Sequence, residues 1–167
     1  MNIYLIGMPG CGKSSVGLKL SEVLNYSYVD LDKYIESKAS KSIPEIFDSV
    51  GEDGFRALEK EALKDYSSLD SYVISCGGGI IKDVSNKELM NGKVVYINVP
   101  LELLEERIKG DKDNIRPMFR TKTVSELYEE RKEKYEIFKD VEVKNIKVLD
   151  CVMDIIKELG LWRVKYL

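Results

Sequence analysis

The stretch Gly7-Met8-Pro9-Gly10-Cys11-Gly12-Lys13-Ser14, directly after the apolar run Ile3-Tyr4-Leu5-Ile6, decides the fold of this chain. It matches the phosphate-loop pattern Gly-x-x-x-x-Gly-Lys-[Ser/Thr] without a gap. In this pattern backbone N–H groups turn toward a polyphosphate, the Lys reaches its terminal phosphates, and the Ser hydroxyl can bind Mg²⁺. Helical periodicity over 14–24 places a helix N-terminus against the anion. The buried strand, the spacing, the Lys and the Ser together favour a phosphate loop over an ordinary glycine-rich turn.

Composition restricts the class of protein. The chain has 167 residues, 44% of them hydrophobic, which is enough for one core but short for two, so we expect one domain over residues 1–167. With 26 Lys and Arg against 29 Asp and Glu, the net charge is −3. This net charge gives no overall positive electrostatic potential that would attract nucleic acid or an anionic membrane. We therefore expect neither as a partner.

The residue types that are missing or scarce narrow the chemistry. The chain has no His, which excludes an imidazole base and the usual zinc sites and leaves carboxylates, Lys, Arg and a bound metal. Cys11, Cys76 and Cys151 are widely spaced and are typical of reduced thiols. The apolar run at the N-terminus is too short for a signal peptide or a membrane span. We therefore expect a cytoplasmic protein.

Short runs rich in Val, Ile and Tyr alternate with longer amphipathic segments, which predicts an α/β fold with a parallel sheet between two helical layers. The predicted strands are 2–6, 26–29, 72–75, 93–98 and 141–143. The predicted helices are 14–24, 31–37, 43–50, 52–66, 83–90, 101–109, 123–138 and 148–159.

Two segments do not fit regular elements. Gly77-Gly78-Gly79 follows the third predicted strand, where a ligand approaching the backbone or a sharp turn would explain three glycines. Residues 110–122 are polar, charged and irregular, with one Pro. They are interpreted as a mobile lid, with a disordered surface excursion as the alternative.

Asp30 and Asp32 leave the end of the second predicted strand, the edge where parallel sheets bind ligands. If the backbone is still extended there, both carboxylates face one cleft, where one helps to hold Mg²⁺ and the other accepts a proton. The alternative is that Asp32 is only the N-cap of the following helix.

Arg56 and Glu59 share one helix face, and with the nearby segment 42–47 they predict a helical insert that walls a pocket for a small anionic molecule. A surface ion pair is the alternative for these two residues. Arg116 in the lid and Arg131 on the next helix add guanidinium groups suited to carboxylate or phosphate.

Together these segments resemble the shikimate kinase family along nearly the whole chain. The block with Gly51-Glu52, Phe55-Arg56 and Glu59, followed by three glycines, is more specific to that family than the phosphate loop is. The resembling segments are 7–14, 30–32, 42–47, 51–59, 77–79, 116–117 and 131–135.

This resemblance implies a nucleoside monophosphate kinase-like fold with five parallel strands, a lid at about 110–122 and a substrate-binding insert at about 31–62. It implies transfer of the ATP γ-phosphoryl group to the 3-hydroxyl of shikimate, with Mg²⁺ as cofactor, by what we expect to be a monomer. Lys13, Asp32 and Arg116 would be catalytic, and Ser14 and Asp30 would bind the metal. The implied nucleotide-binding residues are Gly10, Cys11, Gly12, Lys13, Ser14, Ser15 and Arg116. The implied shikimate-binding residues are Asp32, Arg56, Gly77, Gly78, Gly79 and Arg131.

Two alternatives remain at this point. A related small-molecule kinase, such as a gluconate or nucleoside monophosphate kinase, shares the loop and the fold. A non-catalytic nucleotide-binding module or a switch protein is the second, although Asn86-Lys87-Glu88-Leu89 lacks the Asp of the Asn-Lys-x-Asp base-reading motif of switch GTPases.

Overall fold

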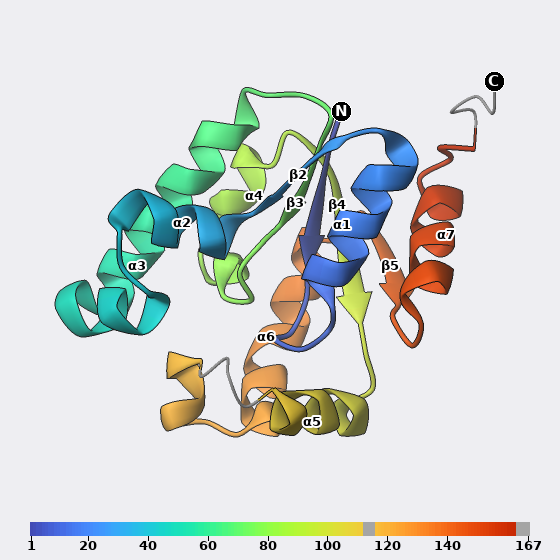
Figure 1. The fold of residues 1–167 in the computed structure, drawn as a ribbon. Helices are drawn as coiled ribbons and strands as arrows, with labels where there is room; N and C mark the ends of the chain where they lie inside the picture. The colour runs from blue at the N-terminus through green and yellow to red at the C-terminus, as the bar shows by residue number, and fades with distance from the viewer. Residues whose placement is uncertain (112–115, 163–167) are drawn as a thin grey trace.

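The computed structural model describes residues 1–111 and 116–162 and contains one parallel sheet of five strands (Figure 1). Along the sheet the strand order is β2-β3-β1-β4-β5. The strands are β1 (Asn2–Ile6), β2 (Ser27–Asp30), β3 (Tyr72–Ser75), β4 (Gly92–Asn98) and β5 (Val141–Lys144). This architecture confirms the predicted α/β fold with five parallel strands.

The central strand explains why the phosphate loop is rigidly placed. All five residues of β1 are buried, and β1 pairs in parallel with both β3 and β4. A strand that is covered on both faces and paired on both edges has little freedom, so the loop that leaves its carboxyl end starts from a fixed point.

Helices cover both faces of the sheet. Figure 1 shows α1 and α7 together on one face and α4 and α6 on the other, while α2 packs along α3 beside the β2 edge. The helices are α1 (Lys13–Leu24), α2 (Leu31–Ala39), α3 (Ile43–Ser67), α4 (Asn86–Leu89), α5 (Leu101–Gly110), α6 (Val124–Phe138) and α7 (Val148–Glu158). Two 3-10 helices, η1 (Ile80–Lys82) and η2 (Pro117–Arg120), complete the described elements.

Local sequence explains most helix ends. Ser42 begins α3 and Thr123 begins α6 with capping boxes, in which Glu45 and Glu126 bond back to the cap residue. Asn25 ends α1 in a left-handed conformation with φ 55°. The Tyr26 N–H then donates to the Ser21 carbonyl at 2.9 Å, so β2 begins at Ser27, one residue later than predicted.

Three predicted helices differ in the structure. Segments 43–50 and 52–66 are one element, α3, with a non-helical Gly51 at φ 71° and ψ −176° marking a kink. The predicted helix 83–90 is wrong at its start, because the helix found there is the short α4, which begins only at Asn86. Asp83 is extended, and its Oδ1 accepts hydrogen bonds from the Ser85 N–H and hydroxyl, which compete with a helical turn.

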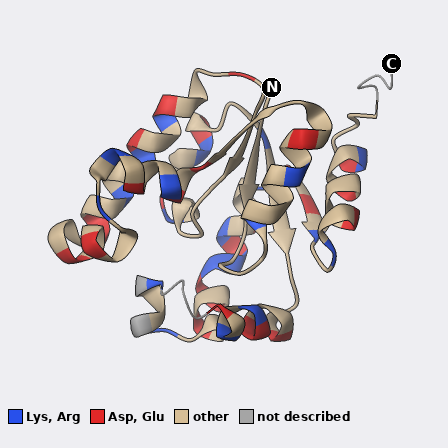
Figure 2. Cartoon of the chain, viewed as in Figure 1, with Lys and Arg blue, Asp and Glu red and all other residues tan. Residues whose placement is uncertain are grey.

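Charged side chains lie mainly on the helices, while few lie on the strands (Figure 2). This distribution matches a sheet that is buried on both faces. Across the described residues, we find no helix with the length and apolar character needed to cross a bilayer. The predicted lid falls around η2, and its residues 112–115 lie outside the described part of the chain.

Candidate active site

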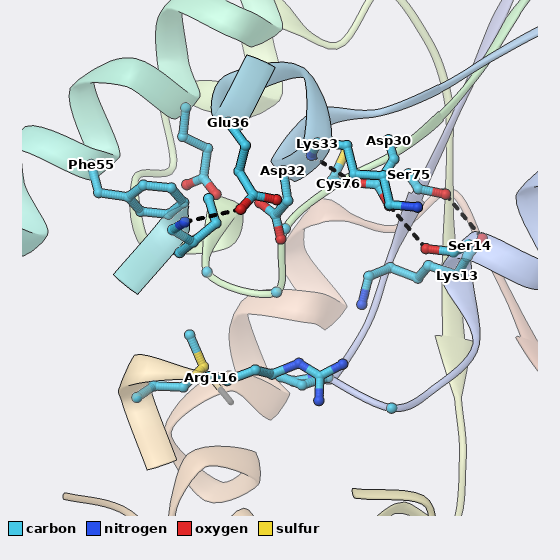
Figure 3. A pocket seen from close by; sticks show the side chains of 18 of the residues that line it. Lys13, Ser14, Asp30, Asp32, Lys33, Glu36, Phe55, Ser75, Cys76 and Arg116 are labelled. Atoms are coloured by element: carbon cyan, nitrogen blue, oxygen red, sulfur yellow. Dashed lines mark hydrogen bonds between the residues drawn. The ribbon is translucent and has the colours of Figure 1, made fainter. Parts of the chain in front are cut away.

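A cavity of about 650 Å³ opens at the carboxyl ends of β1, β2 and β3. Most of the predicted site residues line it, although they come from segments far apart in the sequence. Figure 3 shows Lys13, Asp32 and Arg116 around this space. The predicted residues in the lining are Gly10, Gly12, Lys13, Ser14, Ser15, Asp30, Asp32, Arg56, Gly77, Gly78, Gly79 and Arg116.

The phosphate loop has the backbone that its glycines predict. Gly10 and Gly12 have φ values of 82° and 92°, a left-handed region that side chains disfavour. Lys13 Nζ donates to the Gly7 and Met8 carbonyls at 2.8 and 3.1 Å, so the ammonium is held at the mouth of the loop. With α1 beginning at Lys13, its first N–H groups and this ammonium form a site for an anion.

Two residues from distant segments hold the loop in place. Asn145, buried in the β5–α7 connection, donates from Nδ2 to the Cys11 carbonyl at 2.8 Å. Arg107 on α5 donates to the Asn145 carbonyl at 2.8 Å and to the Gly10 and Cys11 carbonyls at 3.4 Å. Sequence reasoning missed Asn145, because a single Asn in a connecting loop has no local signature.

Ser14 and Asp30 lie beside the anion site. The Ser14 hydroxyl donates to Asp30 Oδ2 at 3.0 Å, which brings two hard oxygen ligands together (Figure 3). In the described residues no group of three His, Cys, Asp or Glu side chains is placed to hold a metal ion. Such a pair fits Mg²⁺, which usually binds one or two protein oxygens together with substrate phosphates and water.

Asp32 lies in the first turn of α2. The helix begins at Leu31, so the condition of an extended backbone through Asp32 is not met, although both carboxylates line the same cavity. Asp30, and not Asp32, is the N-cap: its side chain accepts from the Lys33 N–H at 3.3 Å. Burial, followed by the charge of Asp30, raises the pKa of Asp32 to about 6.

Arg56 and Glu59 form a pair in the wall of the cavity and not on the surface. Arg56 Nη1 donates to Glu59 Oε1 at 3.0 Å, and Glu59 is only 1% exposed. Burial is the main cause that raises the pKa of Glu59 to about 7, while the Arg56 charge lowers it.

The three glycines let charged side chains approach the backbone. A Cβ on Gly77 would lie 2.7 Å from Asp32 Oδ1 and 2.8 Å from Glu59 Oε2. A Cβ on Gly79 would lie 2.3 Å from two Arg56 nitrogens. These distances are shorter than side chains tolerate, so glycine here is explained by close packing against the site.

Arg131 and Cys11 lie outside the lining of the main cavity. Arg131 is 1% exposed, and its Nη2 donates to Met118 Sδ at 3.5 Å. It lines a smaller neighbouring cavity of about 360 Å³ with Lys82, Glu130 and Lys134. The Cys11 side chain is buried, which leaves only its backbone for ligand contact.

A model of the shikimate kinase family matches residues 9–159 of the chain. The chain belongs to the shikimate kinase family. Among its relatives, the shikimate kinase of Synechococcus elongatus is 35% identical over 171 residues, covering 94% of this chain and 89% of the relative. The shikimate kinase of a Sulfurihydrogenibium species is 41% identical over 140 residues, covering 81% of this chain and 83% of the relative.

A solved structure places the whole fold in the same family. The shikimate kinase of Acinetobacter baumannii, in complex with shikimate, is 32% identical and has a TM-score of 0.89. The similarity covers 98% of this chain and 95% of that one. The shikimate kinase fold therefore includes the phosphate loop, the α2–α3 segment and η2 of this chain.

Proposed function

We propose that this protein is an active shikimate kinase, which transfers the ATP γ-phosphoryl group to the 3-hydroxyl of shikimate and produces shikimate 3-phosphate and ADP. The proposal rests on the residues that line one cavity. A single cavity joins a phosphate loop to a half-buried Asp and an Arg, here Lys13, Asp32 and Arg56. Such a cavity suits a donor polyphosphate and a small hydroxylated carboxylic acid side by side.

The donor end is built for ATP with Mg²⁺. The loop N–H groups and Lys13 would bind the phosphates, and Arg116 would add positive charge from the opposite wall. Ser14 and Asp30 would hold Mg²⁺, which when bound neutralises phosphate charge. Phosphoryl transfer through a loose transition state depends mainly on such positioning and charge stabilisation.

The acceptor end is built for a carboxylate and hydroxyls. Arg56, with Arg131 once its guanidinium is released from Met118, would bind the shikimate carboxylate through bidentate hydrogen bonds. Asp32 would orient the 3-hydroxyl and accept its proton as the new O–P bond forms and the bond to the ADP leaving group breaks. Backbone groups of Gly78 and Gly79 would contact the remaining hydroxyls.

Two parts of the chain would move around a fixed core. The insert at about 31–62 carries Asp32, Arg56 and Glu59, and the lid at about 110–122 carries Arg116 and Met118. Closing them together would exclude water that otherwise hydrolyses ATP. Because every residue of the proposed site belongs to one chain, a monomer would suffice, and sedimentation velocity measures that state directly.

The test is an ADP-release assay with four separate acceptors, namely shikimate, gluconate, AMP and CMP. We expect turnover with shikimate and background rates with the other three. Turnover only with gluconate, AMP or CMP would assign a related kinase activity. ATP binding without turnover on any acceptor would indicate a non-catalytic module.

A matched pair of variants tests whether turnover depends on the phosphate-loop end of the cavity. Lys13→Met removes the ammonium at the phosphate loop and should abolish turnover. Lys19→Met removes an exposed α1 ammonium that pairs with Glu22 at 3.2 Å, and it should keep the wild-type rate. Equal rates in the two variants would contradict the assignment of the donor site.

A further inference from the structure

Glu59 is a buried acid that is hydrogen-bonded to one cation, Arg56. Its Oε1 accepts from Arg56 Nη1 at 3.0 Å, while its Oε2 has no hydrogen-bond partner in the described part of the chain. A carboxylate that is 1% exposed is costly to ionise unless a cation compensates it. The ionisation of Glu59 is therefore sensitive to whatever else Arg56 binds.

Charged and titratable groups face Glu59 from four segments. Arg56 lies on the same helix, α3, Asp32 on α2 and Arg131 on α6, while Cys76 follows β3. Burial raises the pKa of the Cys76 thiol, so this group stays neutral near pH 7. Arg56 and Arg131 thus face Glu59, and Arg56 and Lys13 face Asp32, so three cations surround the two carboxyls.

The unpartnered oxygen of Glu59 faces another acid. Glu59 Oε2 and Asp32 Oδ1 both lie within 2.8 Å of the position that a Cβ on Gly77 would take, and neither has a hydrogen-bond partner among the residues described. A proton on Glu59 Oε2 would therefore lie near a second carboxyl, that of the half-buried Asp32. Placing a proton there is more favourable than placing a second negative charge there.

The acceptor competes with Glu59 for Arg56. If the proposed function holds, the acceptor carboxylate binds the Arg56 guanidinium and brings another negative charge into the same cavity. Arg56, which already pairs with Glu59 and with the half-exposed Glu52, then faces a third carboxylate. We infer that binding of the acceptor is coupled to uptake of a proton from solvent by Glu59.

This coupling has a defined sign. Because the complex holds more protons than the free protein, the affinity for the acceptor falls as pH rises through neutrality. Because Glu59 is about half protonated near pH 7 in the free protein, it can take up at most about half a proton at that pH. Glu59 is in this scheme a positioning residue that acts through Arg56 and does not touch the reacting atoms.

Calorimetry tests the inference on the whole protein. Shikimate is titrated into protein saturated with ADP and Mg²⁺ at pH 7.0, in PIPES and in imidazole, two buffers with different ionisation enthalpies. The difference in binding enthalpy gives the number of protons exchanged. We expect an uptake of up to about half a proton in the wild type, and none in Glu59→Gln.

Two further variants separate proton uptake from a merely structural role. Glu52→Gln removes the other carboxylate near Arg56, with Oε1 3.6 Å from Nη2, but Glu52 is half exposed and its pKa is already lowered by Lys82. This variant should keep the uptake. Glu59→Asp, which keeps a titratable acid, should restore part of it.

Each result decides a separate question. Equal binding enthalpies in the two buffers, or an uptake that persists in Glu59→Gln, would overturn the inference and leave the proposed function intact. Absence of any shikimate binding would instead refute the proposed function and this inference with it. Should Glu59→Gln fail to fold, a wild-type Kd for shikimate that stays constant from pH 6 to 8 would still overturn the coupling.

Discussion

Asp32 is placed to receive a proton at neutral pH. Burial raises its pKa to about 6, which makes it a stronger base than an exposed Asp while leaving it largely ionised at pH 7. The carboxylate is therefore available in the range where an enzyme of this kind works, and its loss on acidification should reduce turnover below about pH 6.

Asp32→Asn should keep ATP binding and lose turnover. The amide cannot accept the hydroxyl proton, and general base catalysis typically contributes about 10²–10⁴-fold, so we expect kcat to fall by that order. Nucleotide titration and steady-state kinetics measure the two effects. Asp154→Asn, an exposed position on α7, is the control, and normal turnover in Asp32→Asn would remove Asp32 from the mechanism.

Gly79→Ala should damage the acceptor site and spare the nucleotide site. The added Cβ would lie 2.3 Å from two nitrogens of Arg56 and would push the guanidinium out of place. We expect KM for shikimate to rise by at least about tenfold, the loss of roughly one hydrogen bond to a charged group, with little change in ADP affinity. Asp154→Asn, at an exposed position on α7 outside the proposed lid and insert, should leave both values unchanged. Equal KM values in the two variants would contradict this account.

At the scale of elements, the kink in α3 shapes the acceptor wall. Gly51 divides the part of α3 that carries Phe47 from the part that carries Phe55, yet the two rings pack with centroids 4.7 Å apart. In a continuous helix without the kink, the Phe47 and Phe55 rings would have a different orientation relative to each other. The glycine therefore decides the shape of the insert.

Gly51→Ala should destabilise this insert. A φ of 71° with a ψ of −176° lies in a region open essentially only to glycine, where another residue costs on the order of 1–3 kcal/mol. Because a Cβ there meets nothing within 4 Å, the loss comes from the backbone and not from a clash. Urea denaturation measures it, with Gly110→Ala as the matched control. An unchanged free energy of unfolding would show that the insert relaxes without cost.

Sequence reasoning succeeded for elements with strong local signals and failed where side chains compete with the backbone. The capping residues Ser42 and Thr123 mark the starts of α3 and α6, as the local pattern indicates. Residues 83–90 have helical periodicity, but hydrogen bonds to the Asp83 side chain replace the first helical turn. The spacing of apolar residues alone does not show that side-chain hydrogen bonds compete with the helical backbone.

For the whole molecule, the buried acid predicts an unusual dependence of stability on pH. The pKa of Glu59 is about 7 in the folded protein and about 4.5 without its surroundings, so between these values the folded state holds more protons than the unfolded state. The free energy of unfolding should therefore fall as pH rises from 5 to 7, by at most about 1.4 kcal/mol per pH unit for one group, and then level off.

Urea denaturation at pH 5, 6, 7 and 8 measures this trend. Glu59→Gln should flatten the slope between pH 6 and 7, where Glu59 titrates in the folded protein, while Asp32, whose pKa is about 6, should keep part of the slope between pH 5 and 6. Glu52→Gln should keep the slope, because the pKa of Glu52 is lowered and it titrates below this range. A stability that rises between pH 5 and 7 in the wild type would contradict the protonated state assigned to Glu59.

The phosphate loop and the five parallel strands can be predicted from the sequence alone, together with the candidate residues of the site. These predictions depend on local backbone geometry and on the spacing of apolar residues, which a linear pattern contains. Three contacts follow only from the folded structure: Asn145 donates to the Cys11 carbonyl, Arg131 donates to Met118 Sδ, and Glu59 and Asp32 both lie against Gly77. Such contacts join residues tens of positions apart, and packing, burial and charge compensation determine them, which no local pattern records.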